Sequence, residues 1–71
     1  MANKEFIHRL EIEKEELEYK KDALSEFIDS DKFNDVNYVQ QLLLPIQLDT
    51  MNAYLTILDA RLYDLEEPFN D

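Results

Sequence analysis

The chain has 71 residues, a formal net charge of −10 at pH 7, one histidine, and neither cysteine nor glycine. These absences exclude disulfides, thiolate or histidine zinc sites within one chain, glycine-rich phosphate loops and nucleophile elbows. The acidic charge disfavours nonspecific binding to nucleic acids and to anionic membranes.

A heptad pattern predicts a first helix over residues 4–29. Asn3 is suited to cap it, because its side chain can accept hydrogen bonds from the first free backbone N–H groups. A helix of this length is about 40 Å long, too long to stand alone in so small a protein. The seam steps by four and three residues and consists of Phe6, Leu10, Glu13, Leu17, Lys20, Leu24 and Phe27.

The segment DSDKFND, residues 29–35, predicts the end of this helix, because its short polar side chains compete for the backbone. We expect a turn over 30–34, with Phe33 packed beneath it. A second helical region follows. Its pattern predicts a short helix 35–44, a bend at Pro45, a main helix 45–66 and a frayed tail 67–71. Its expected seam is Leu44, Gln47, Met51, Tyr54, Leu58, Arg61 and Leu65.

The two expected seams match in antiparallel order when residue numbers sum to 74 or 75. This pairing places Glu13 opposite Arg61 and Lys20 opposite Tyr54, so an ion pair would set the register of the hairpin. The predicted fold is an all-α antiparallel helical hairpin with a kinked second helical region, forming one domain over 1–71. The apolar pairs would be Leu10 with Leu65, Leu17 with Leu58, and Leu24 with Met51.

More apolar residues are present than one hairpin seam can bury. A small domain without disulfides or metal needs further stabilisation, and exposed apolar surface of this kind indicates association. We therefore expect a symmetric homo-oligomeric bundle. The residues outside the expected seam are Ile7, Ile12, Tyr19, Ile28, Leu43, Ile46, Leu48, Leu55, Ile57 and Leu62.

The sequence predicts a binding protein rather than an enzyme. No second histidine, Ser-His-Asp set or metal-ligand cluster is present, so we expect no catalytic residues, no metal and no cofactor. The many carboxylates are typical of a solvated helix face. No apolar run approaches 20 residues and the N-terminus lacks a signal-peptide core, which favours the cytoplasm. An anionic ligand would have to meet the basic first helix together with Arg61.

Two segments resemble a known family. RLEIEKEELEYKKDALSEFI, followed by Phe33 and then LLPIQLDTMNAYLTILDARL, is similar to the helical hairpin of phage anti-CBASS proteins, which also occurs in phage anti-Thoeris proteins. The resemblance covers about residues 6–62. Its matching elements are Arg9, Leu10, Glu13, Lys14, Leu17, Leu24, Phe27 and Ile28, then Gln47, Met51, Tyr54, Leu58 and Arg61.

The resemblance implies a function. Proteins of that family sequester cyclic nucleotide messengers in the cytoplasm of infected bacteria and do not cleave them. Their ligands are cyclic trinucleotides, cyclic dinucleotides or cyclic ADP-ribose isomers, bound between protomers of an oligomer that is often a hexamer. Carried over by matching position, the candidate ligand-binding residues are Arg9, Lys14, Tyr54 and Arg61. The cations would meet phosphates and the tyrosine would stack on a base or donate a hydrogen bond.

Two other functions fit the composition. Dense carboxylates on a rigid helical rod imitate the phosphate spacing of DNA, which is typical of an acidic inhibitor of a host nuclease or DNA-binding protein. A purely structural oligomerisation module is the third possibility. A messenger-binding protein responds to cyclic nucleotides, a DNA mimic to a basic host protein, and a structural module to neither.

Overall fold

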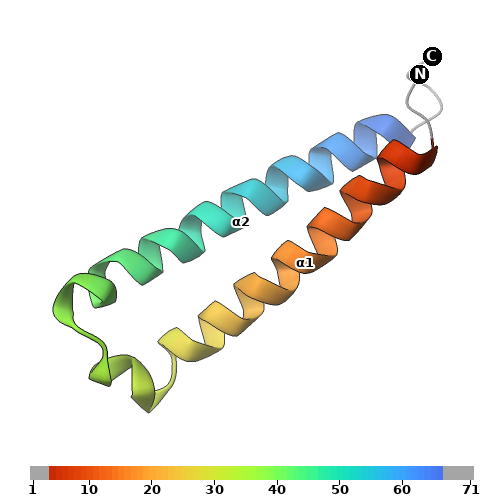
Figure 1. The fold of residues 1–71 in the computed structure, drawn as a ribbon. Helices are drawn as coiled ribbons and strands as arrows, with labels where there is room; N and C mark the ends of the chain where they lie inside the picture. Colours follow the sequence, from red (N-terminus) through yellow and green to blue (C-terminus); the bar gives the residue numbers. More distant parts are fainter. Residues whose placement is uncertain (1–3, 67–71) are drawn as a thin grey trace.

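The computed structural model describes residues 4–66, which form two long antiparallel helices joined by a short helical turn (Figure 1). Helix α1 spans Lys4–Ile28, the 3-10 helix η1 spans Asp31–Asp35, and helix α2 spans Tyr38–Glu66. The molecule is a rod with principal dimensions of 51 × 16 × 15 Å. The predicted all-α hairpin is confirmed. Asn3 and the tail over 67–71 lie outside the described residues.

The turn between the helices is held by side chains. Phe33 packs against Phe27 edge to face, with ring centroids 6.2 Å apart, as expected for a residue beneath the turn. Asn37 caps α2, because its Oδ1 accepts a hydrogen bond from the backbone N–H of Gln40 at 2.9 Å. The side-chain amide of Gln41 donates to three backbone carbonyls of the turn, between 3.1 and 3.3 Å away. These contacts fix where the chain reverses.

The predicted break at Pro45 is wrong. Helix α2 is continuous from Tyr38 to Glu66 and contains Pro45 within it. Proline removes one backbone donor from the helix ladder, a cost that packing on either side can offset. Here Leu44 and Leu48 both lie on the half-buried side of α2 and face α1, so the helix is held before and after the proline. The segment 35–44, predicted as a separate short helix, is therefore part of α2. Helix α2 begins at Tyr38, three residues later than that prediction.

The seam of α2 differs from the predicted one at every second position. Gln47, Tyr54 and Arg61 are exposed, and each is replaced in the seam by the leucine that follows it. One residue turns a helix by about 100°, so this shift moves the polar residues to the edge of the contact. The observed seam is wholly apolar: Leu44, Leu48, Met51, Leu55, Leu58, Leu62 and Leu65.

The same shift occurs in α1. Phe6 and Lys20 are exposed, whereas Lys14 and Lys21 occupy the seam with side chains 32% and 29% exposed. Glu13 is half-buried at its edge. The ordered set of inward residues is Ile7, Leu10, Lys14, Leu17, Lys21, Leu24 and Ile28.

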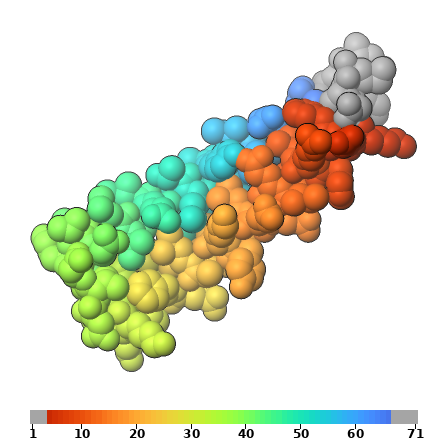
Figure 2. Space-filling model, viewed as in Figure 1, coloured from red at the N-terminus to blue at the C-terminus, as the bar shows by residue number. Residues whose placement is uncertain are grey.

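A small leucine cluster forms the core, at the end of the rod where α1 begins and α2 ends. Leu58 is fully buried, and Leu10 and Leu62 are 4% and 7% exposed beside it. Leu65, which the sequence had paired with Leu10, packs against this cluster together with Ile7 and Leu17. Figure 2 shows the two helices in contact along the rod.

No helix among residues 4–66 is long and apolar enough to cross a membrane.

Candidate functional site

The seam divides the surface of the hairpin into two long edges, and the candidate residues fall on both. One edge contains the positions expected to lie in the seam, and we call it the Tyr54 edge. Seven-residue spacing aligns them along each helix, since seven residues make nearly two turns. Its members are Glu13 and Lys20 on α1, Arg9 beside them, and Gln47, Tyr54 and Arg61 on α2.

Tyr54 and Glu13 join the two helices along this edge. The Tyr54 hydroxyl donates a hydrogen bond to Oε2 of Glu13. The sequence had paired Glu13 with Arg61, and that pairing is wrong: no ion pair between them is present in the structure. The physical reason is the one-residue shift of the α2 seam, which turns Arg61 outward and brings the long Tyr54 side chain within reach of Glu13.

Two guanidinium groups lie at the same height on the Tyr54 edge. The Lys14–Asp59 and Tyr54–Glu13 contacts lie on either side of a register in which Arg9 is level with Arg61. Arg61 is exposed. Nη2 of Arg9 lies 2.6 Å from Oε1 of Glu5, but both side chains are more than 70% exposed. Exposed pairs of this kind contribute little and are readily exchanged for another anion. Arg9 and Arg61 can therefore both turn toward a phosphate.

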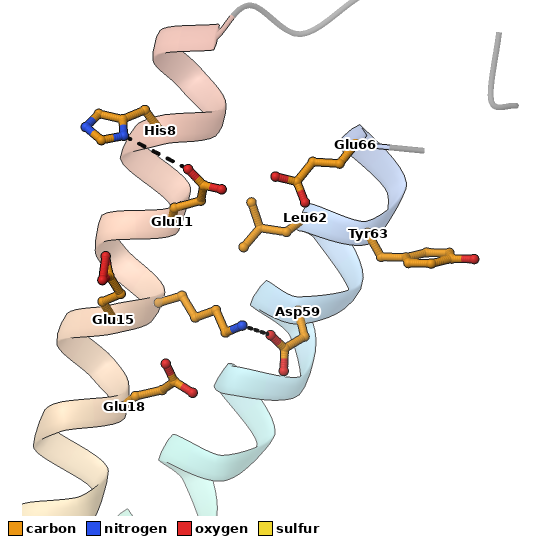
Figure 3. Close-up of a pocket in the computed structure, with 9 residues that line it drawn as sticks. His8, Glu11, Glu15, Glu18, Asp59, Leu62, Tyr63 and Glu66 are labelled. Carbon is orange, nitrogen blue, oxygen red and sulfur yellow. Dashed lines mark ion pairs between the residues drawn. The ribbon is translucent and has the colours of Figure 1, made fainter. Parts of the chain in front are cut away.

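Lys14 lies on the opposite edge, in a groove with a volume of about 590 Å³ (Figure 3). Its Nζ reaches across to α2 and lies 2.6 Å from Oδ1 of Asp59. On α1, Nδ1 of His8 lies 4.0 Å from Oε1 of Glu11. The groove is lined by His8, Glu11, Lys14, Glu15, Glu18, Asp59, Leu62, Tyr63 and Glu66.

This groove is unsuited to a phosphate. Five carboxylates line it, against Lys14 and His8, and the Lys14 ammonium is already bound to one of them. An anion entering here would meet repulsion from carboxylates at close range, where screening by salt is weak. Lys14 is therefore a structural cation that links the helices. The structure brings Arg9, Tyr54 and Arg61 to one edge and leaves Lys14 on the other.

The Lys14–Asp59 ion pair should make the folding stability fall at alkaline pH. Its hydrogen bond to Asp59 raises the pKa of Lys14 above the ordinary value of about 10.4. Because the pKa of Lys14 is higher in the folded state than in the unfolded state, the ion pair stabilises the folded state fully below the unfolded-state pKa. This stabilisation is lost as pH rises through the folded-state pKa. We expect wild type to lose more unfolding free energy above pH 10.4 than Lys14→Met, measured by chemical denaturation at stepped pH. Parallel curves for the two proteins would contradict this role.

Sequence reasoning missed Asp59 as a partner of Lys14. The signal was available, because 14 and 59 sum to 73, one less than the expected antiparallel pairing. It also missed the Tyr54–Glu13 bond, because 54 and 13 sum to 67, seven less than the expected pairing. Within residues 4–66, no group of three or more His, Cys, Asp or Glu side chains is placed to hold a metal ion.

The chain matches a known family model. The family is described as Sequestin, and the match covers residues 4–64, which includes α1, η1 and nearly all of α2. No curated protein and no solved structure matches the chain. The matched segment contains the Tyr54 edge, the acidic groove and the leucine core.

Proposed function

The chain belongs to the Sequestin family, and from this premise we propose that it is a phage counter-defence protein that sequesters cyclic nucleotide messengers without cleaving them. The family name fits a protein that acts by holding its target. The finer proposal, a cyclic trinucleotide, cyclic dinucleotide or cyclic ADP-ribose isomer, comes from the anti-CBASS and anti-Thoeris resemblance of the sequence. Its setting is the cytoplasm of the infected bacterium.

The Tyr54 edge is the observation that carries this proposal. It offers Arg9 and Arg61 at one height, a guanidinium pair that suits two phosphate groups of one cyclic ligand. Tyr54, 41% exposed, lies on the same edge and supplies a flat ring for a base. The exposed amide of Gln47 extends the row with donors and an acceptor for base edges. Lys14 is not part of this proposed site, because Asp59 already holds it.

Binding between protomers is part of the proposal. One edge of a rod 15–16 Å thick contacts only one side of a cyclic nucleotide, whereas binding sites usually bury most of the ligand surface. A second copy that closes over the edge supplies the other wall and repeats the arginines. Repetition around an oligomer, with a hexamer as the family resemblance implies, then builds a positive pocket in a protein of net charge −10.

The test is a thermal-shift panel of cyclic di-AMP, cyclic di-GMP, cyclic tri-AMP and cyclic ADP-ribose. A ligand at about 100 times its Kd adds about 2.7 kcal/mol per site to the folded state. In a domain of this size that free energy raises Tm by roughly 10–20 °C. We expect at least one compound to give such a shift, with linear AMP as the matched control that does not. No shift across the panel would refute the proposal.

The acidic groove favours one second candidate function. Its row of carboxylates on α1, together with the net charge, presents regularly spaced anions along a rigid rod as DNA does. A DNA mimic would bind a basic host protein with a strong dependence on salt and would give no thermal shift with cyclic nucleotides. The panel separates the two functions.

A further inference from the structure

The two helices differ on the faces that point away from the hairpin seam. The outer side of α1 contains two large apolar residues, Ile12 and Tyr19, among carboxylates such as Glu15 and Glu16. On α2 the outer side is apolar over about five turns, and we call it the outer face of α2. Its large residues are 51–59% exposed, and the whole face consists of Val39, Leu42, Leu43, Ile46, Thr50, Ala53 and Ile57.

The outer face lies opposite the hairpin seam. Leu42, Ile46 and Ala53 each precede a seam leucine by two positions, and two residues turn a helix by about 200°. Helix α2 is thus apolar on two opposite sides, a pattern typical of a helix that is buried on both. The hairpin covers only one of them.

The distribution of charge on α2 indicates which partner covers its outer face. From Tyr38 to Leu58 the only charged residue of α2 is Asp49. Two copies of a chain with net charge −10 repel each other, and that repulsion is smaller when they meet through this face, which only Asp49 flanks with a charge between Tyr38 and Leu58. A basic partner would find no carboxylate row on this face. The face suits a second copy of the same chain.

The face is also prepared for close packing. The hydroxyl of Thr50 donates to the carbonyl of Ile46 at 2.9 Å, so its donor is satisfied and can be buried at little cost. Ala53 leaves space on one side of this position, and the larger Leu43 and Ile46 project on the other. Apart from Ile57, the large residues lie in the first half of the face and the small ones follow, so Leu43 and Ile46 meet small residues when a second face is reversed against the first.

We propose that the outer faces of two α2 helices pack antiparallel around a twofold axis, with paired residue numbers summing to 96. Two of the large side chains of each copy then lie against smaller ones of the other. Leu43 lies opposite Ala53, and Ile46 lies opposite Thr50. At the two ends Val39 packs on Ile57. The contact is a four-helix arrangement in which the acidic α1 helices stay outermost.

This inference deepens the proposed function and rests on it for the connection to ligand. Leu43, which belongs to the outer face, and Tyr54, which borders it, lie 11 residues apart and so on nearly the same side of α2. A second copy seated on the outer face therefore stands beside the Tyr54 edge. The ligand site and the contact between copies share a border at Tyr54.

Sedimentation equilibrium without nucleotide tests the contact. Wild type should have a mass that is a multiple of 8.5 kDa, and Ile46→Glu should shift it toward 8.5 kDa. Tyr63→Glu is the matched control, because Tyr63 is equally exposed on α2 (62% against 59%) but lies in the groove. Its mass should equal that of wild type. A monomeric wild type, or Ile46→Glu with an unchanged mass, overturns the proposal.

Cysteine cross-linking tests the register without disrupting the contact, and the chain has no cysteine of its own. Under oxidation, a mixture of Val39→Cys and Ile57→Cys chains should form covalent heterodimers. Each variant alone should not, since 18 residues of helix separate its two copies by about 27 Å in this register. Cross-linking of either variant alone, or none in the mixture, overturns the proposed packing. Both tests omit nucleotide. If the thermal-shift panel gives no shift but the cross-link forms, only the proposal of a cyclic nucleotide ligand is refuted.

Discussion

Leu58→Ala is expected to remove most of the stability of the protein. Leu58 is the one fully buried side chain of the described residues, and it joins Leu10 and Leu62 in the core. Truncating a buried leucine to alanine costs about 2–5 kcal/mol, because the transferred methyl groups are lost and a cavity remains. Domains of this size have a total stability of only about 3–5 kcal/mol. Thermal unfolding followed by circular dichroism should show Tm lowered by at least about 10 °C.

The matched control for this prediction is Ile12→Ala. Ile12 is 41% exposed on the outer side of α1, and alanine has the higher helix propensity. Its Tm should stay within a few degrees of wild type. Both proteins are compared at equal concentration, because association links stability to concentration. If Leu58→Ala melts like Ile12→Ala, then the leucine cluster is not what holds α1 against α2.

The double variant Arg9→Ala/Arg61→Ala is expected to abolish messenger binding while leaving the hairpin folded. Each arginine is exposed, so its loss removes no core contact. A hydrogen bond to a charged group contributes about 1.5–3 kcal/mol, so each single variant should lower affinity by about 10-fold or more. Isothermal titration with the panel compound that gives the largest thermal shift measures the loss.

Lys32→Ala provides the control for charge alone. Lys32 lies in η1, at the far end of the rod from Arg9 and Arg61, and is exposed. Removing it changes the net charge as much as one arginine does. Its affinity should equal that of wild type. Equal losses for Lys32→Ala and Arg61→Ala would mean that the ligand responds to overall charge and that the Tyr54 edge is not its site.

Much of the fold follows from the sequence because heptad spacing constrains it strongly. The leucines at seven-residue intervals, such as Leu10 and Leu17 in α1 and Leu58 and Leu65 in α2, do lie toward the other helix. The seam positions that lie between these leucines were predicted wrongly. Two heptad patterns contain the same leucines, and they differ by one residue at each position in between. In α1 either choice places two charged residues in the seam, so α1 could not decide. In α2 the observed seam has leucines at the positions that differ, Leu48, Leu55 and Leu62, which the expected seam left outside.

The site was less predictable than the fold for the same reason. A one-residue error rotates a side chain by about 100°, which leaves a core leucine near the core but moves a polar residue to another surface. Tyr54 and Arg61 consequently turned from the seam to its edge, and Lys14 turned from the edge into the seam. The proline error had a different cause: sequence propensity counts the lost hydrogen bond of Pro45, whereas the packing of α2 on α1 is tertiary.

We propose that the protein holds a cyclic nucleotide and releases it unchanged. The direct measurement is to incubate the protein with a slight excess of the bound panel compound, remove free ligand by filtration, denature the protein, and identify the released compound by mass spectrometry. We expect intact cyclic nucleotide, in a fixed ratio to wild-type protein and absent from Arg9→Ala/Arg61→Ala. Recovery of a linear product, or of equal amounts from wild type and the double variant, would contradict it.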